Sequence, residues 1–215
     1  NITPDSFSDG GRWLVEANSP PAVSVVLKQC RAWVEAGAAV LDVGGESTRP
    51  GAEPLSRELE SARVLPVIEA LAADAKCSEA VISVDTGHAS VARAALEVGA
   101  DVVNDISGLA DPHMAEAVAS AGAGLVVGHM RGTPSTMQRD IHFVNLLAEV
   151  TGELQASMQR ARDAGVEDQQ MLVDPCIGFG KTADQSAALS LAAAALERDC
   201  GRPVLIGVSR KSFIG

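Results

Sequence analysis

Several apolar segments of the sequence end in side chains that form strong hydrogen bonds. Asp85 lies near the end of AVISVDT, Asn104 near the end of DVVNDISG, and Asp174 near the end of QMLVDP. A carboxylate accepts hydrogen bonds from two neighbouring N–H groups at once, whereas a side-chain amide both donates and accepts. Polar residues directly after a buried parallel strand are where α/β proteins place their ligand-binding groups.

Hydroxyl and cationic side chains end two further segments. Ser209, Arg210 and Lys211 follow PVLIGV, and Thr48 and Arg49 lie in the polar loop after AVLDVGG. The net charge of -11 argues against nucleic acid and anionic membranes as partners, because both need a basic surface. It does not exclude an anionic small substrate, since a few cations in one cleft can override the charge of the whole chain.

The elements that must position these side chains alternate along the chain. Near-continuous apolar runs are typical of buried parallel strands, and apolar residues at helical spacing separate them. Expected strands lie at 40–43, 80–86, 101–108, 124–132, 170–175 and 203–209. Expected helices lie at 21–36, 54–73, 88–98, 112–121, 144–164 and 186–200. Pro66 is expected to kink or end the second helix.

This alternation has no linker-like break, so we expect one α/β domain over residues 1–215. Eight such units form a (β/α)8 TIM-type barrel of ~250 residues. Six complete strands predict such a barrel truncated at both ends, with the start of strand 1 and unit 8 missing. A doubly wound sheet is the alternative. It is less favoured because polar residues end every strand, whereas an open sheet concentrates its ligand at one switch point.

The composition predicts a soluble, cytoplasmic protein. Apolar residues make up 47% of the chain and charged residues 21%, and no apolar run approaches the ~20 residues that span a bilayer. The four cysteines are widely spaced, as expected for free thiols in a reducing compartment, and they are Cys30, Cys77, Cys176 and Cys200.

Seven motifs in order resemble dihydropteroate synthase, the folate-pathway transferase that sulfonamides inhibit. They are NITPDSFSDGG, DVGGESTRPGA, SVDT, NDISG, HMRGTP, DPCIGFGKT and GVSRKSFIG, and they extend from the first residue to the last. The resemblance implies a (β/α)8 barrel and a homodimer. The implied reaction joins 6-hydroxymethyl-7,8-dihydropterin diphosphate to 4-aminobenzoate, giving 7,8-dihydropteroate and diphosphate, with Mg2+.

The same resemblance implies roles for individual residues. Asp174 and Asp85 read the pterin ring with Asn104 beside them, and Lys211 donates to a ring oxygen or nitrogen, so the expected catalytic residues are Asp85, Asp174 and Lys211. Asn1 is the expected Mg2+ ligand, an oxygen donor of the kind that this ion prefers. The remaining expected substrate-binding residues, for the diphosphate, the benzoate and the pterin, are Thr48, Arg49, Pro50, Phe7, Met130, Phe179, Gly207, Ser209 and Arg210.

Structural roles compete with several of these assignments. Asp85 and Asp174 each open a strand-to-helix loop and could instead cap a helix. Phe179 could be a core residue and Arg49 a surface arginine. Asp42 lies among valines, so we expect a buried carboxylate bonded to another polar group, structural rather than catalytic.

Other patterns are discounted. GFGKT at 178–182 resembles half a P-loop, but Pro175 occupies the position of the first glycine, which argues against nucleotide hydrolysis. The histidines show no i, i+4 ligand pair, so a zinc site is not expected; they are His88, His113, His129 and His142.

Two other functions stay open at this point. One is a pterin-binding methyltransferase domain, which shares the barrel but is disfavoured by the SRKS, STRPG and TPDSF loops. The other is a non-catalytic pterin-binding barrel, because the Arg-x-His pair expected on an eighth strand lies beyond this sequence and the fragment is expected to be crippled or inactive. Cys176 and Arg131 depart from the family's usual glycine and glutamine.

Overall fold

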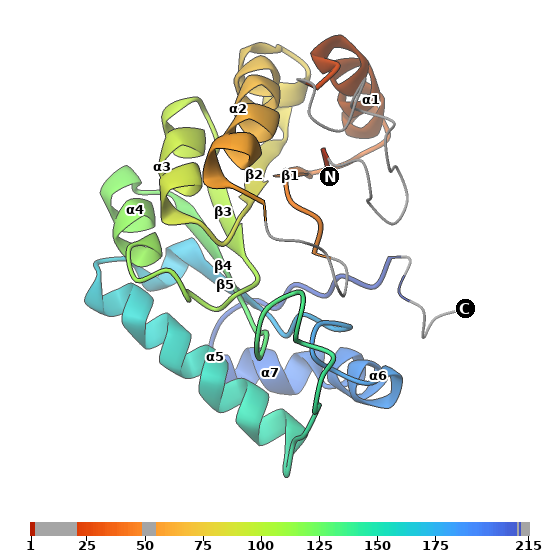
Figure 1. Ribbon diagram of the computed structural model, residues 1–215, viewed down its shortest axis with the longest axis vertical. Helices are drawn as coiled ribbons and strands as arrows, with labels where there is room; N and C mark the ends of the chain where they lie inside the picture. Colours follow the sequence, from red (N-terminus) through yellow and green to blue (C-terminus); the bar gives the residue numbers. More distant parts are fainter. Residues whose placement is uncertain (3–20, 49–54, 210, 212–215) are drawn as a thin grey trace.

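The computed structural model describes residues 1–2, 21–48, 55–209 and 211, and its centre is a parallel sheet (Figure 1). The sheet has the strand order β1-β2-β3-β4-β5. Its strands are β1 (Val40–Gly44), β2 (Val81–Asp85), β3 (Val102–Asp105), β4 (Gly124–Gly128) and β5 (Met171–Asp174). Each strand therefore pairs in parallel with the next strand along the chain.

Helices follow the strands and form an outer arc around the sheet (Figure 1). They are α1 (Val23–Glu35), α2 (Arg57–Ala73), α3 (Ala89–Glu97), α4 (Met114–Ala121), α5 (Leu146–Asp163), α6 (Ala183–Leu191) and α7 (Ala193–Cys200). Two 3-10 turns, η1 (Cys77–Glu79) and η2 (Asp168–Gln170), precede β2 and β5. Among the described residues, no helix is both long and apolar enough to cross a membrane.

Side chains along each strand point alternately to a face that the helices cover and to an open face. Alternate strand side chains are at most 6% exposed against the helices, including Leu41, Val43, Ile82, Val84, Val103, Leu125, Val127, Met171 and Val173. On the opposite face, Val40 is 53% and Val81 is 40% exposed. Sequential strand order with the helices on one face is the topology of a (β/α)8 barrel, whereas a doubly wound sheet carries helices on both faces. The predicted fold class is confirmed.

Backbone hydrogen bonds extend the sheet at both edges. The Ile2 amide donates to the Gly44 carbonyl at 2.7 Å, beside β1. Next to β5, the Val173 amide donates to Pro203 O and the Leu205 amide to Val173 O, forming a single parallel bridge at Val204. The expected strand at 203–209 is therefore wrong in length. It pairs with β5 over this short stretch only, and most of its residues are exposed.

Of the kink or break expected at Pro66, the break is wrong, since α2 continues unbroken to Ala73. Proline removes one helical hydrogen bond, a loss that burial on the sheet outweighs. Beyond the proline, Val67, Ile68 and Leu71 are at most 1% exposed, so the last turns of α2 are held by tertiary packing.

The expected helix at 186–200 is two helices that meet at Ala192. The first begins earlier than expected because Thr182 and Gln185 form a capping box. The Thr182 Oγ1 accepts from the Gln185 amide at 3.2 Å, and the Gln185 side chain accepts from the Thr182 amide at 2.9 Å. This T-x-x-Q signature is readable in the sequence and marks a helix start.

Gly128, at the end of β4, packs too closely against the neighbouring backbone to be replaced by a larger residue without loss of stability. A Cβ on Gly128 would lie 2.5 Å from Ile106 Cα and 2.7 Å from Asp105 O, atoms that cannot move without shifting β3. Gly128→Ala is therefore expected to destabilise the protein by about 3 kcal/mol. Chemical denaturation measures this loss.

Gly152, in the middle of α5, is the matched control because a Cβ there would meet no atom within 4 Å. Gly152→Ala should stabilise the protein by about 0.5–1 kcal/mol through helix propensity. Equal free energies of unfolding for the two variants would contradict the packing at Gly128.

Candidate functional site

The register of the sheet places the predicted acid and amide side chains on one face. Side chains alternate along a strand, and directly paired residues point to the same face. Asp85 is paired with Asn104, Asn104 with Val126, and Gly128 with Asp174. Because Val126 and Gly128 are two residues apart, the side chains of Asp85, Asn104 and Asp174 share the open face at its carboxyl end. We call these three residues the strand-end group.

Asp42 lies on the same face and binds this group directly. Its Oδ2 accepts a hydrogen bond from Asn104 Nδ2 at 3.2 Å. The expected pairing is therefore present. Asp42 is exposed to the open face rather than covered by protein, although desolvation by the surrounding residues still raises the pKa of its carboxyl group. The other end of the amide, Asn104 Oδ1, is buried and has no hydrogen-bond partner in the described part of the chain. It is an acceptor available to a donor on a ligand.

The carboxyl group of Asp85 is held in a strongly acidic neighbourhood. Desolvation, followed by repulsion from Asp42 and Glu60, raises the pKa of Asp85 well above its usual value. A Cβ on Gly44 would lie 2.8 Å from Asn1 Oδ1 and 3.1 Å from Asp85 Oδ2, so both oxygens approach the same backbone position. Asn1 and Asp85 thus lie side by side over Gly44, which has no side chain to separate them.

Asp174 lies at the end of β5 beside two lysines. Its Oδ1 accepts from the Cys176 amide at 2.7 Å. Desolvation raises the pKa of Asp174 to about 6, although that hydrogen bond and the charges of Lys211 and Lys181 lower it. Cys176 has a φ of 48°, in the left-handed region that glycine enters without strain. The glycine that the family resemblance implies at this position would adopt this backbone conformation without strain.

Lys211 and Phe179 lie together near Asp174. The Lys211 Nζ is 4.2 Å from the centroid of the Phe179 ring, within the range of a cation–π contact. Desolvation lowers the pKa of Lys211, opposed by the nearby charges of Cys176 and Asp174. Phe179 is half-buried in a loop, so it is not a core residue. The structure therefore brings Asp174, Phe179 and Lys211 into one neighbourhood.

A cavity of about 250 Å3 opens at the ends of β1, β2 and β3. Three predicted residues line it, namely Thr48, Asp85 and Met130. Gly207 and Ser209 are exposed and, among the described contacts, form no hydrogen bond to the strand-end group. The remaining predicted residues lie outside the described part of the chain, and they are Phe7, Arg49, Pro50 and Arg210.

Neither aspartate is a helix cap, which excludes the structural alternative for Asp85 and Asp174. The N-cap of α3 is His88, and the N-cap of α6 is Thr182. The Ala89 amide at the start of α3 donates instead to Asp111 at 3.0 Å.

Sequence reasoning missed one set of residues that could hold a divalent cation. Ligand atoms of Glu46, Glu60 and His88 lie within 4.8 Å of one another. They come from three separate segments, so no sequence spacing reveals them. His88 Nδ1 already lies 2.7 Å from Glu60 Oε2, and Glu46 Oε1 accepts from the Leu55 amide. We interpret the set as a hydrogen-bonded contact that joins α2 to the loop after β2, with Glu46 bonded to the Leu55 amide.

Comparisons with known proteins agree on one family. The pterin binding enzyme family matches residues 1–215. The dihydropteroate synthase of Synechocystis sp. is 44% identical over all of this chain and 71% of the relative, and that of Escherichia coli K12 is 42% identical over all of this chain and 72% of the relative.

Solved structures agree with the sequence comparisons. Yersinia pestis dihydropteroate synthase, solved in a sulfonamide drug complex, superposes with a TM-score of 0.90 and 37% identity, covering all of this chain and 74% of its own. The Xanthomonas albilineans enzyme, solved with 4-aminobenzoic acid, has a TM-score of 0.83 and 39% identity, covering all of this chain and 72% of its own. The chain described here belongs to the dihydropteroate synthase family of pterin-binding enzymes.

Proposed function

We propose that this protein is a transferase that joins 6-hydroxymethyl-7,8-dihydropterin diphosphate to 4-aminobenzoate, giving 7,8-dihydropteroate and diphosphate in folate biosynthesis. The observation that carries the proposal is the convergence of the strand-end group on one face of the sheet. Family membership over the whole chain supports the same reaction. We also propose that residues 1–215 belong to a single pterin-binding domain.

The pterin edge fits the chemistry of the strand-end group. A pterin presents an exocyclic amine and a ring N–H side by side, which one carboxylate can accept together. We assign this role to Asp174, with the unpartnered Oδ1 of Asn104 accepting from a further N–H. Lys211 donates to a ring oxygen or nitrogen, as its position near Asp174 allows.

We place the benzoate and the diphosphate against the loops that follow the strands, beyond the strand-end group. Phe179, with Lys211 over its ring, supports the benzoate ring, and Thr48 faces the same cavity as Asp85. Sulfonamides that imitate 4-aminobenzoate would compete for this subsite. The family resemblance adds further contacts to the benzoate, the diphosphate and the pterin from Phe7, Arg49, Pro50, Met130, Gly207, Ser209 and Arg210.

The oxygen of Asn1 fits the expected Mg2+, because it lies beside a carboxylate oxygen and oxygen ligands suit this ion. When bound, Mg2+ would neutralise charge on the departing diphosphate. Location in the cytoplasm and assembly as a homodimer complete the proposal, as they are expected for the family.

Asp85 supplies the electrostatic part of the mechanism. 4-Aminobenzoate is a neutral aromatic amine, so the barrier lies in departure of the diphosphate, with positive charge growing on the pterin methylene. Desolvation, followed by repulsion from Asp42 and Glu60, raises the pKa of Asp85 in the free protein. The Asp85 carboxylate attracts this charge more strongly as the charge grows, so the attraction is strongest in the transition state.

A product assay tests the proposal. The protein, incubated with the pterin diphosphate, 4-aminobenzoate and Mg2+, should release 7,8-dihydropteroate and diphosphate in equal amounts. Omitting either substrate should abolish both products. Diphosphate release that does not depend on 4-aminobenzoate would contradict the proposal, because it would indicate hydrolysis rather than transfer.

A further inference from the structure

We propose that Lys181 is a positioning residue for the aromatic-amine subsite. This inference rests on the proposed function, because it assigns Phe179 to the benzoate ring. Lys181 belongs to the GFGKT segment, which the sequence alone leaves without a role once a P-loop is rejected.

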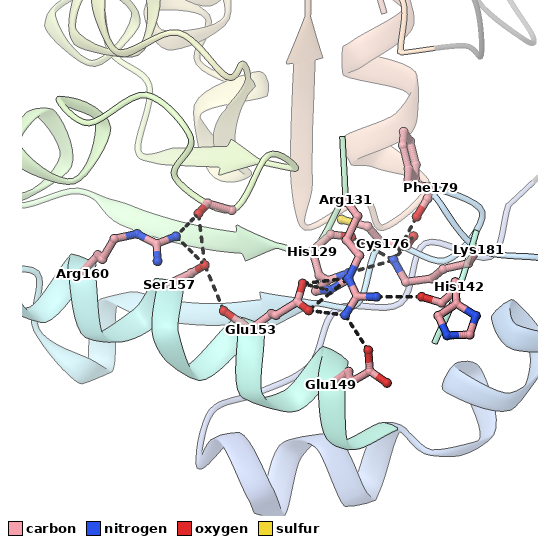
Figure 2. Close-up of polar contacts among 11 residues, drawn as sticks. His129, Arg131, His142, Glu149, Glu153, Ser157, Arg160, Cys176, Phe179 and Lys181 are labelled. Atoms are coloured by element: carbon pink, nitrogen blue, oxygen red, sulfur yellow. Dashed lines mark hydrogen bonds and ion pairs between the residues drawn. The ribbon is translucent and has the colours of Figure 1, made fainter. Parts of the chain in front are cut away.

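Lys181 joins two loops through a buried ammonium group (Figure 2). The residue is 3% exposed. Its Nζ donates to the carbonyl oxygens of His129 and Phe179, both at 2.9 Å, and lies 3.4 Å from that of Cys176. The loop after β4 and the loop after β5 therefore share one set of donors.

The charge of Lys181 is costly where it lies. Among the described residues, no carboxylate forms an ion pair with it, and burying an unpaired ammonium is unfavourable. Desolvation lowers the pKa of Lys181 to about 8, against the raising effect of Cys176, Asp174 and Glu153. The ammonium is compensated by carbonyl and imidazole acceptors, so we explain its burial by the geometry that it imposes on those groups.

The His129 ring accepts a further hydrogen bond from the Lys181 ammonium group. Its Nδ1 lies 3.0 Å from Lys181 Nζ, and its Nε2 lies 2.9 Å from Glu153 Oε2. Because Lys181 has only donors, Nδ1 must accept, so the proton of the neutral ring is on Nε2 and points to Glu153. Desolvation and the charge of Lys181 lower the pKa of His129 to about 4, consistent with a neutral ring.

Arg131 connects the chain of contacts to α5 (Figure 2). It donates to Glu153 at 3.0 Å, to Glu149 at 2.7 Å and to the His142 carbonyl at 2.8 Å. The glutamine that the family resemblance implies here has a single NH2 group, which could not donate to all three acceptors. In this chain the contacts therefore continue from the loop of Phe179 through Lys181, His129 and Glu153 to a long helix.

The loop is also held from the opposite side. Gln138 Nε2 donates to the Gly178 carbonyl at 2.9 Å, and the Gly178 amide donates to Ser186 Oγ at 3.0 Å. These contacts fix the backbone just before Phe179, and Lys181 holds the Phe179 carbonyl just after it. Losing Lys181 would leave the carbonyl of Phe179 itself without its donor, so the ring should lose its fixed orientation while the strand-end group keeps its own.

The test is Lys181→Met, which keeps the length of the side chain and removes its charge and donors. We expect the KM for 4-aminobenzoate to rise about 30-fold, an effect of the size of a buried hydrogen-bonded group. The KM for the pterin diphosphate should stay within about twofold, because the variant leaves Asp174 and Asn104 in place. A lysine that served only stability would not separate the two KM values.

The matched control is Lys76→Met, because Lys76 is a partly exposed lysine that pairs with Glu79 at 2.8 Å. It should change neither KM. Should Lys181→Met fail to fold, Lys181→Arg keeps the charge, and its planar guanidinium cannot reproduce the lysine contacts. That variant should raise the KM for 4-aminobenzoate severalfold. Unchanged values in the folded Lys181 variants would overturn the inference.

Deuterium uptake separates this inference from the proposed function. Amides at 176–180 should exchange faster in the Lys181 variant than in the unsubstituted protein, whatever reaction the protein catalyses. If the unsubstituted protein makes no dihydropteroate, the proposed function fails, but deuterium uptake still tests whether Lys181 holds the loop of Phe179 in place. Unchanged uptake at 176–180 in the Lys181 variant would by itself overturn that role of Lys181.

Discussion

Asp174→Asn is expected to lower kcat/KM for the pterin diphosphate by roughly 10³-fold, a loss of about 4 kcal/mol. The carboxylate at the end of β5 accepts two ligand N–H groups in our account. An amide replaces one acceptor oxygen with an NH2 group, which meets the ligand's own donor and loses the charge assistance. Initial rates of dihydropteroate formation at saturating 4-aminobenzoate measure the effect.

Asp101→Asn is the matched control, because Asp101 is a carboxylate at the opposite end of the same sheet. Its Oδ2 accepts from the Ile82 amide at 2.8 Å, just before β3. This variant should lose some stability and keep its kcat/KM within about threefold. Equal losses of kcat/KM in the two variants would remove the distinction between the two ends of the strands.

The pH dependence of binding follows from the raised pKa of Asp174, which is about 6 rather than 3.8. Pterin binding needs the carboxylate, so kcat/KM should fall as the pH drops below about 6. The effect on stability has the opposite sign. The native state retains this proton between pH 3.8 and 6, so the stabilisation from Asp174 is present at low pH and is lost as the pH rises through 6.

Asp85→Asn is expected to lower kcat by roughly 10²-fold while changing the KM for the pterin diphosphate less. The attraction between Asp85 and the pterin methylene develops with the positive charge, so its loss raises the barrier more than it weakens ground-state binding. Single-turnover rates and equilibrium binding of the pterin diphosphate separate these two effects.

Asp105→Asn provides the contrast, since Asp105 follows Asn104 directly but points to the helix-covered face. It is fully buried and accepts from the amides of Ser107 and Leu109 at 2.8 and 3.1 Å. This variant should lower the thermal midpoint by several degrees and leave kcat within about threefold. A larger fall in kcat for Asp105→Asn than for Asp85→Asn would contradict the assigned roles.

The sequence predicts the sheet and its functional edge because two simple periods determine them. Continuous apolar runs mark β1 to β5, and side chains alternate strictly along each strand. Asp85, Asn104 and Asp174 each follow directly after a valine that is buried against the helices. Because successive side chains point to opposite faces, the three polar side chains share the open face, and local sequence was sufficient for that result.

Other features depend on contacts that no local pattern contains. The stretch 203–209 has a strand-like composition, yet only the part around Val204 pairs with a neighbour. Lys181 bonds mainly to carbonyl oxygens, which every residue possesses, so its role is invisible in the sequence. The exposure of Asp42 likewise depends on how the open face is covered and not on the valines beside it.

The most direct test is a crystal structure of the protein with 6-hydroxymethyl-7,8-dihydropterin diphosphate bound. The account predicts the pterin ring at the carboxyl end of the strands, with Asp174, Asn104 and Lys211 each about 3 Å from a ring heteroatom. A ring bound elsewhere, with those three side chains still in contact only with protein, would contradict it.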